Sequence, residues 1–480
     1  MNIADLNWGN DSAEKDPDLM EYFVDSDAYN RVKNLSKEIV IGRKGSGKSA
    51  LRKRVERHFE GLTNYHIVSV CPKHNAFRSI LNDPDLKKGF GQEIFFQQTW
   101  IRQLALDSLC LLGHSEKSSY CDGSMAFARD VSLQLNRTSK DFVENISEVL
   151  KSVKAKVGDL GEYGVSIEKE LRNIADNDSL EHHLAEIAKS GAQIVFTVDD
   201  LDLGWDNSTT ANNLLLGLLA AMNHLKSLTP NIHYVIFLRE DVYEILLTKT
   251  QHSDKYRNCE RIRWEKNGLV SVLNERINYN RKQHGLSSIE NPFETVFPST
   301  IGTSNTDNWL TERTLSRPRE LIQFSRYYTE SVTGEAPEIE VLKSSEKDYS
   351  SWKLDDLSTE YSNQYPNLSA VFSFWKTKFF RHKYHLSRAE VSGMILDILA
   401  ECTINDQWFA EISDETDVNT MLRILYEIGF LGDFVLGGDG GSQTFYSYTG
   451  RHEPILNEVQ IHPCFRKAVN TVDRIRLKKP

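Results

Sequence analysis

The eight residues from Gly42 to Ser49 are the part of the sequence whose types and spacing point most directly to chemistry. They read GRKGSGKS and match the pattern G-x-x-x-x-G-K-[ST] in full. Glycines allow successive backbone N–H groups of such a loop to point into one concavity and hold an anion. We expect Lys48 to reach the β- and γ-phosphates of a nucleotide, and the Ser49 hydroxyl to coordinate Mg²⁺. The predicted nucleotide-binding residues are Gly42, Arg43, Lys44, Gly45, Ser46, Gly47, Lys48, Ser49 and Ala50.

A second group of candidate residues follows the apolar run in VFTVDDLD. Asp199 and Asp200 come directly after the run, and Asp202 follows two residues later. We expect Asp199 to hold Mg²⁺ through its water shell and Asp200 to polarise an attacking water. The alternative is that a strand which meets solvent simply ends in carboxylates. The preceding phosphate-binding pattern favours the metal site.

Arginines supply the remaining candidates for contacts with phosphate. Arg239, in VIFLRED, is predicted to sense the γ-phosphate from a strand end, and its alternative is an ion pair with Glu240 or Asp241. In TLSRPREL, Arg317 and Arg319 flank a proline at a helix start, where one of them could close over the phosphates. Arg257 and Arg261 are candidates for a finger that reaches into a neighbouring subunit, although an arginine there is more often a solvated surface residue.

These side chains need a sheet to position them. Apolar runs followed by helical patterns predict strands, and the order strand, helix, strand between residues 193 and 238 implies a parallel sheet with a crossover. The predicted strands are 38–42, 64–70, 193–198, 233–238 and 261–264. A helix preceding the first strand, a weakly patterned insertion at about 113–180 and a helical region after residue 265 complete this part of the chain.

The last hundred residues have a different pattern. Helices at 388–401 and 418–431 precede short strands around a glycine-rich turn, which predicts a winged-helix module. A winged helix that reads DNA carries basic residues around its recognition helix. Residues 376–480 contain 13 Lys and Arg against 14 Asp and Glu, and the expected recognition helix has a single basic residue, Arg423. This composition favours a packing surface over a base reader.

The whole chain has the composition of a globular protein. Its 480 residues are 40% hydrophobic with a formal net charge of −11, which argues against indiscriminate nucleic-acid binding. The six cysteines have no CxxC pair or zinc-like spacing, and the N-terminus is acidic rather than signal-like. The longest apolar run, Leu214 to Met222, is too short to cross a membrane. We therefore expect a cytoplasmic protein with reduced thiols and no membrane partner.

The motifs GRKGSGKS, FTVDDLD, FLRED and RPREL together resemble the AAA+/STAND side of the P-loop ATPases. More narrowly, they are similar to a bacterial family of stand-alone P-loop ATPases associated with antiviral defence genes. The resemblance implies ATP and Mg²⁺ as cofactors, a five-stranded parallel core, a helical lid and a C-terminal winged helix. It also implies a protein effector or neighbouring subunit as partner, in a homo-oligomer or hetero-complex. Many related ATPases carry Glu where this chain has Asp200, so we expect slow or partner-stimulated turnover.

The predicted fold class is α/β, a P-loop NTPase core with lid and winged helix. We assign residues 1–265 to the core, 266–335 to the lid, 336–375 to a linker and 376–480 to the winged helix. The leading functional hypothesis is an ATP-hydrolysing switch that regulates an effector, with Lys48, Asp200 and Arg239 as catalytic residues. The alternatives are a DNA-binding ATPase of the loader kind, which DNA contacts through the winged helix would support, and a nucleotide-binding scaffold without hydrolysis.

Overall fold

The computed structural model describes residues 1–71, 80–87, 91–114, 120–135, 146–152, 172–173, 175–201, 204–437, 441–450 and 453–472. The chain divides into two compact units. Unit 2 is Asp25–Ile262, and unit 1 combines Met1–Val24 with Arg263–Pro480. Asp202, the glycine-rich 158–164 stretch of the predicted insertion and the basic 474–479 segment lie outside the described residues.

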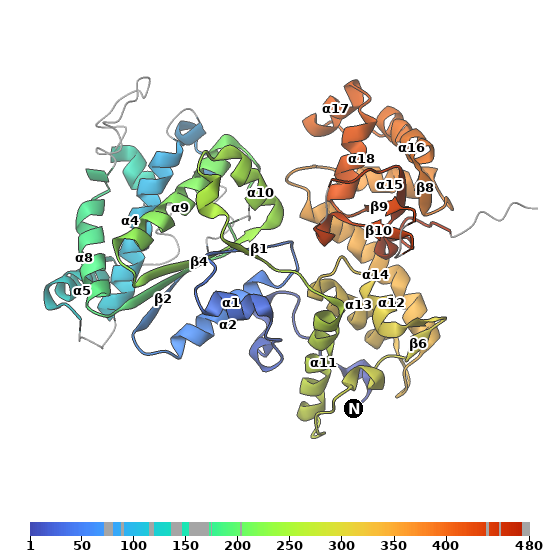
Figure 1. The fold of residues 1–480 in the computed structure, drawn as a ribbon, viewed down its shortest axis with the longest axis horizontal. Coiled ribbons are helices and arrows are strands. Elements are labelled where there is room, and N and C mark those ends of the chain that lie inside the picture. The colour runs from blue at the N-terminus through green and yellow to red at the C-terminus, as the bar shows by residue number, and fades with distance from the viewer. Residues whose placement is uncertain are drawn as a thin grey trace, which may run out of the picture. The chain divides into compact units, whose positions relative to one another are not determined.

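Unit 2 is built on a five-stranded sheet in which every pairing is parallel (Figure 1). The order is β2-β3-β4-β1-β5. The strands are β1 (Ile39–Gly42), β2 (Tyr65–Val70), β3 (Gln193–Val198), β4 (Ile232–Arg239) and β5 (Cys259–Arg261). All strands therefore end at the same edge, where the loop after β1 and the carboxylates after β3 are separated by one strand, β4.

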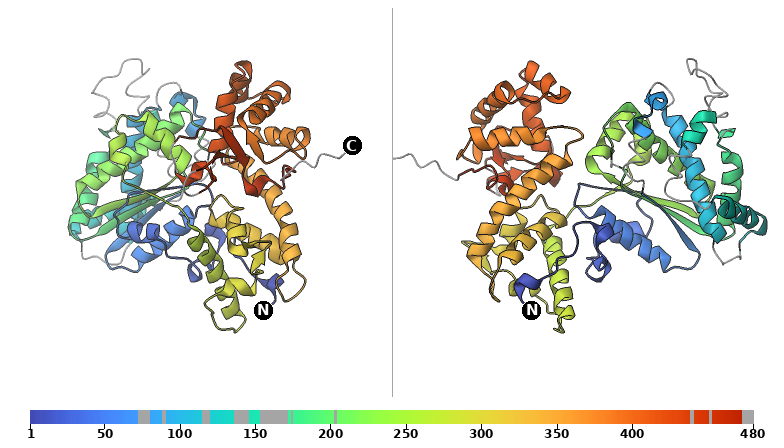
Figure 2. Two further views of the ribbon diagram at one scale, coloured as in Figure 1. Left: turned by 45° about the vertical axis from the view of Figure 1, so that its right-hand side comes forward. Right: turned by 180° about the vertical axis from the view of Figure 1, so that it is seen from behind.

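Helices cover both faces of this sheet, as a parallel sheet requires. Helices α1 and α2 lie on one face, and α4, α9 and α10 on the other (Figures 1 and 2). The helices of unit 2 are α1 (Asp27–Lys33), α2 (Lys48–Glu60), α4 (Glu93–His114), α5 (Asp122–Leu135), α8 (Asn177–Lys189), α9 (Thr209–Leu228) and α10 (Glu240–Lys249), with η5 (Ser253–Tyr256) before β5. One apolar core joins the sheet to α4, α5, α8 and α9.

The first part of unit 1 is helical. It contains α11 (Lys266–Gln283), η6 (Pro292–Thr295), β6 (Thr300–Ile301), β7 (Ser304–Asn305), α12 (Thr306–Thr311), α13 (Pro318–Ser331), α14 (Ile339–Glu360) and α15 (Leu368–Lys378). The segment 336–375, which we expected to be a linker, is therefore mostly helix. Leu342, Tyr349 and Leu357 recur at helical spacing and are buried in the core of the unit, so the polar residues around them form only the outer face.

The last part of unit 1 has the helices and sheet of a winged helix (Figure 2). Its elements are β8 (His385–Ser387), α16 (Arg388–Glu401), α17 (Gln407–Asp414), α18 (Val418–Glu427), β9 (Leu431–Val435), β10 (Gln443–Phe445), η7 (Ser447–Thr449), β11 (Glu458–Ile461) and η8 (Pro463–Phe465). The sheet is antiparallel in the order β10-β9-β11-β8. A capping box between Ser387 and Glu390 fixes the start of α16.

The N-terminal segment belongs to unit 1, although we expected it to be part of the core domain. It contains η1 (Ile3–Asp5), η2 (Ala13–Lys15) and η3 (Leu19–Glu21). Ile3, Leu6 and Trp8 are buried in the core of unit 1, and the Trp8 indole donates to Thr329 Oγ1 at 2.9 Å.

The architecture confirms the predicted fold class, an α/β P-loop NTPase core followed by a helical region and a winged helix. Strand β3 has the predicted bounds, whereas β5 ends at Arg261, where we predicted a strand to begin. Among the described residues, none of the helices has both the length and the apolar character that a membrane crossing requires.

Candidate functional site

The loop between β1 and α2 has a backbone that glycine permits. Gly45 and Gly47 have φ angles of 79° and 97°, in the left-handed region that disfavours side chains. A Cβ at Gly42 would lie 2.4 Å from Ser46 Oγ, because the loop curls back over its own first residue. Each glycine of the motif thus has a local reason, and the loop is as tightly curled as a phosphate-binding turn requires.

Lys48 begins α2 and turns back over the loop. Its Nζ donates to the carbonyl oxygens of Gly42 at 2.9 Å and Arg43 at 3.4 Å. The N-cap residue Gly47 has no side chain with which to accept from the first N–H groups of this 13-residue helix. An uncapped helix N-terminus beside a lysine amine fits a polyphosphate, since both attract negative charge.

Ser49 and Asp199 come together at this edge of the sheet. Asp199 is 1% exposed, and the Asp200 N–H donates to its Oδ1 at 2.9 Å. Burial raises the pKa of Asp199, and Lys48, the Asp200 N–H, Ser49 and Arg52 act in the opposite direction. The two predicted metal residues are therefore neighbours at this edge of the sheet although 150 residues separate them in the sequence.

The residues present fit a magnesium ion that is shared with nucleotide phosphates. Mg²⁺ prefers oxygen ligands and in such sites takes one or two from the protein and the rest from phosphates and water. Ser49 and Asp199 would supply the protein oxygens. Across the described part of the chain no group of three or more His, Cys, Asp or Glu side chains could hold a metal ion by itself.

Asp200 follows β3 with a φ of 61° and is half-buried. A left-handed aspartate directly after a buried strand is uncommon and concentrates at functional sites. The structure thus places Asp200 beside Asp199 at the edge where Lys48 and Ser49 lie. Its role with an attacking water stays a prediction.

Arg239 ends β4, and its register partner in the sheet is Gly42. Its side chain is 9% exposed and bonds to Asp241 in a bidentate pair, Nε to Oδ1 at 3.0 Å and Nη2 to Oδ2 at 2.5 Å. The ion pair that we gave as the alternative therefore forms, at the start of the phosphate-binding loop. Sensing by Arg239 would require the guanidinium to leave Asp241 or to act while paired.

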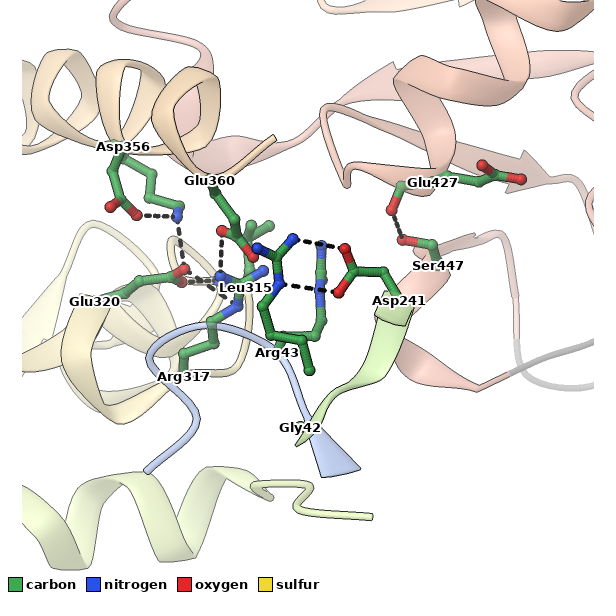
Figure 3. A network of polar contacts seen from close by, with 12 residues as sticks. Gly42, Arg43, Asp241, Leu315, Arg317, Glu320, Asp356, Glu360, Glu427 and Ser447 are labelled. Atoms are coloured by element: carbon green, nitrogen blue, oxygen red, sulfur yellow. Dashed lines mark hydrogen bonds and ion pairs between the residues drawn. The ribbon is translucent and has the colours of Figure 1, made fainter. Parts of the chain in front are cut away.

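The arginines of the predicted lid and finger have different surroundings. In unit 1, Arg317 Nη1 donates to Glu360 Oε2 at 2.7 Å, and its Nε lies 3.5 Å from Glu320 (Figure 3). Arg317 is 2% exposed, whereas Arg319 is half-buried. Of the finger candidates, Arg257 is exposed and Arg261 pairs with two glutamates of α10, Glu240 and Glu244.

Two further residues lie near Asp199 and were not predicted from the sequence. Arg52 lies beneath Asp199, with its Nε 3.4 Å from Asp199 Oδ2. Cys71 follows β2 close to the same charges, and burial raises the pKa of its thiol to about 11. Arg52 could have been found, since it stands one helical turn after Lys48 on α2. No sequence pattern indicates Cys71.

Comparisons with known proteins give three similarities. A family described as the FunZ-associated C-terminal helical domain matches residues 267–358, from the start of α11 into α14. This match crosses the predicted boundary at 335/336, where the structure also has helices on both sides. The chain is 21% identical over 500 residues to a putative transposon gamma-delta 80.3 kDa protein of Escherichia coli (strain K12), covering 96% of this chain and 67% of the relative.

Among solved structures, the Aeropyrum pernix ORC1 protein in complex with DNA aligns with a TM-score of 0.36 and 11% identity. The alignment covers 92% of this chain and 91% of that chain. The P-loop fold of this chain is defined by its own strand order and by the loop that carries Lys48 and Ser49.

Proposed function

We propose that the chain binds ATP with Mg²⁺ and hydrolyses it slowly, as a molecular switch whose state a partner reads. The observation that carries the proposal is that Ser49 lies near the buried Asp199, beside a curled loop and an uncapped helix start. A mere glycine-rich turn would have no reason to bring a hydroxyl and a buried carboxylate together. Adenine as the base rests on the family resemblance.

Each side chain has a separate task in this proposal. The loop amides and Lys48 hold the phosphates, and Ser49 with Asp199 holds the metal, whose bound charge offsets that of the phosphates. Asp200 accepts hydrogen bonds from the attacking water and orients it. Arg239 stands at the end of the neighbouring strand and exchanges Asp241 for the γ-phosphate.

The charges on the winged helix favour contact with a protein partner over the reading of DNA bases. On α18 the residues that face outward include Asn419, Thr420 and Arg423. Arg423 is bonded to Glu453 and lies 3.4 Å from Glu427, so the basic residue of this helix is neutralised by two carboxylates. A helix with paired charge offers a phosphate backbone little attraction.

The biological setting that we propose is control of an effector in prokaryotic antiviral defence. This part rests on the resemblance of the four motifs to defence-associated ATPases. The curated relative is named for a transposon, so a function connected with mobile DNA is the broader setting in which such an effector would act.

The test of nucleotide binding is Lys48→Ala. We expect it to weaken ATP binding at least about tenfold, because a charge-assisted contact to phosphate contributes about 1.4 kcal/mol or more. Lys53→Ala, on the same helix but about 140° around it, is the matched control and should bind as the wild type does. Equal affinity of the Lys48→Ala variant and the wild type in isothermal titration would refute the assignment.

Hydrolysis is tested separately with Asp200→Asn. The amide keeps the shape of the side chain but is a poor proton acceptor, so phosphate release should fall about a hundredfold while ATP affinity stays within twofold. Phosphate release that continues at the wild-type rate would remove Asp200 from its role. Wild-type binding without any release, with or without a partner, would instead favour the scaffold hypothesis.

A DNA-binding ATPase is the second candidate, because exposed basic residues lie in the last turn of α15 and shortly after it. Lys376 and Arg381 are exposed, although Lys378 pairs with Glu401 at 2.7 Å. If this candidate holds, duplex DNA should shift at low salt, and neutralising these three residues should weaken the shift and flatten its salt dependence. Absence of a shift at low salt would discard it.

A further inference from the structure

A partly buried polar cluster lies next to Asp199 and takes no part in the contacts with nucleotide described above. We name it the Arg52 cluster: Arg52 and Glu56 on α2, Ser69 on β2 and Thr197 on β3. Arg52 Nη1 donates to Glu56 Oε1 at 3.0 Å and to Ser69 Oγ at 3.1 Å. The cluster therefore ties the helix of the phosphate-binding loop to two strands of the sheet.

Glu56 is the anchor of this cluster. Its Oε1 also accepts from Ser69 Oγ at 2.9 Å and from Thr197 Oγ1 at 2.5 Å. Three donors from three elements thus fix one carboxylate, whose side chain is 14% exposed. Because charge-assisted hydrogen bonds are short and directional, the position of Glu56 determines where the Arg52 guanidinium lies.

The other side of the guanidinium faces the metal carboxylate. Arg52 Nε lies 3.4 Å from Asp199 Oδ2, and the two side chains are 8% and 2% exposed. Asp199 Oδ1 is already engaged by the Asp200 N–H. Arg52 thus stands between two carboxylates, the half-buried Glu56 and the buried Asp199, which would repel each other without it.

We propose that Arg52 is a positioning residue for the magnesium site, which holds the Asp199 carboxylate in the orientation that Ser49 and the metal require. The inference rests on the proposed function. Groups behind a first layer of metal ligands orient those ligands, and their loss costs about 10- to 100-fold in metal affinity. Lysine cannot replace arginine here, because a single ammonium cannot face Glu56, Ser69 and Asp199 at once.

A competing role for Arg52 would change the metal affinity of its variants in the opposite direction. If Arg52 were a resident cation that competes with Mg²⁺ for Asp199, its removal would strengthen metal binding. The direction of the change therefore decides between positioning and competition.

The experiment measures metal binding rather than turnover. The full chain is saturated with a non-hydrolysable ATP analogue and titrated with Mn²⁺, which shares the octahedral oxygen preference of Mg²⁺ and is followed by its electron paramagnetic resonance signal. Arg52→Gln should raise the Mn²⁺ dissociation constant about tenfold. Binding of the analogue in EDTA should stay within twofold, because Glu56, Ser69 and Asp199, which Arg52 contacts, are not among the predicted phosphate-binding residues. Arg57→Gln, exposed on the same helix, is the matched control.

Ser69→Ala gives a second measurement, since Ser69 is exposed and its loss should not prevent folding. It removes one hydrogen bond to Arg52 and one to Glu56. We expect the Mn²⁺ dissociation constant to rise about threefold, which is less than for Arg52→Gln. Unchanged or tighter Mn²⁺ binding in both variants, with a wild type that binds the analogue, would overturn the inference and leave the proposed function standing. A wild type that binds no analogue would overturn both.

Discussion

At the scale of single residues, the site depends on groups that the fold brings into one another's reach. Ser49 and Asp199 were predicted from two motifs, and their proximity follows from the rule that parallel strands end at one edge. Arg52 and Glu56 were missed because their contacts are with Ser69 and Thr197, which are ordinary strand residues in the sequence. A three-dimensional cluster of common residue types leaves no pattern along the chain.

Cys71 offers a prediction about pH dependence. Burial raises the pKa of its thiol from 9.0 to about 11, so the neutral thiol is favoured in the folded state. The proton-bound form is therefore stabilised, and folded stability should fall as the pH rises above 9 toward 11. At pH 8 the thiolate fraction of Cys71 should be about a hundredfold below that of an ordinary thiol.

Iodoacetamide labelling with mass spectrometry measures this difference. Cys121 is exposed and serves as the internal comparison. We expect Cys121 to label at pH 8 and Cys71 to label at a comparable rate only above pH 10. Rapid labelling of Cys71 at pH 8 would contradict the burial that raises its pKa.

At the scale of elements, the strands were the most predictable parts. Buried parallel strands are continuous apolar runs, and 193–198 is such a run between polar residues, so β3 has the predicted bounds. Strand β5 pairs with β1 alone at the sheet edge, and its three residues include Glu260, which pairs with Arg31. Because two of its three residues are charged, β5 does not have the apolar pattern of a strand, and the sequence predicted the neighbouring residues 261–264 instead.

Helix packing gives a prediction from two glycines. Gly217 lies inside α9, where a Cβ would stand 2.7 Å from Phe96 Cβ and 2.8 Å from the Gln97 backbone nitrogen of α4. Gly217→Ala should destabilise unit 2 by roughly 1–3 kcal/mol through overpacking. Gly393, inside α16, has nothing within 4 Å of the same position. Gly393→Ala should stabilise unit 1 by about 0.5–1 kcal/mol. Thermal unfolding of both variants measures the two changes in stability. Changes of the same sign would contradict the packing described for the two glycines.

The buried charges of unit 1 give a second prediction at this scale. Lys353 is fully buried and contacts Glu320 at 2.8 Å and Asp356 at 3.0 Å, beside the pair of Arg317 with Glu360 (Figure 3). Arg317→Met should destabilise unit 1 by about 3–5 kcal/mol, because it leaves buried carboxylates without their cation.

Arg319→Met is the matched control for this change, since Arg319 is half-buried and lies two residues further on, in the first turn of α13, of which Arg317 is the N-cap residue. It should cost about 1 kcal/mol or less in chemical denaturation. Equal losses for the two variants would show that the buried network does not set the stability of this helix. A stable Arg317→Met protein with weakened ATP binding would restore Arg317 as the lid residue.

At the scale of the whole molecule, the structure divides the chain at Ile262/Arg263, and it assigns residues 1–24 to unit 1. We had placed the boundary at 265/266 and the N-terminal segment in the core domain. Nothing in residues 1–24 shows that their partners are α11 and α13, because Asn7 bonds to Asn280 across 273 residues of sequence. Pairings of this range depend on shape, which local patterns do not encode.

Trp8 tests this assignment. It is 2% exposed and packs against Phe297 in unit 1. Trp8→Ala should cost about 3–5 kcal/mol. In hydrogen exchange followed by mass spectrometry, peptides from α11 and α13 should exchange faster while those from β3 and β4 stay protected. Trp205→Ala, in the core of unit 2, should give the reverse pattern. Faster exchange of β3 in the Trp8 variant would contradict the division.

The division of the chain also sets an order in time. Unit 2 is one continuous stretch of sequence that interrupts the sequence of unit 1. A ribosome therefore completes unit 2 before it has synthesised the residues that pack against the first 24. At typical synthesis rates, the 273 residues between Asn7 and Asn280 take roughly a quarter of a minute to one minute. During that interval Ile3, Leu6 and Trp8 have no native surface to cover them. The nascent unit 2 should therefore fold first. The exposed apolar residues of the N-terminal segment should bind chaperones until α11 and α13 have been synthesised.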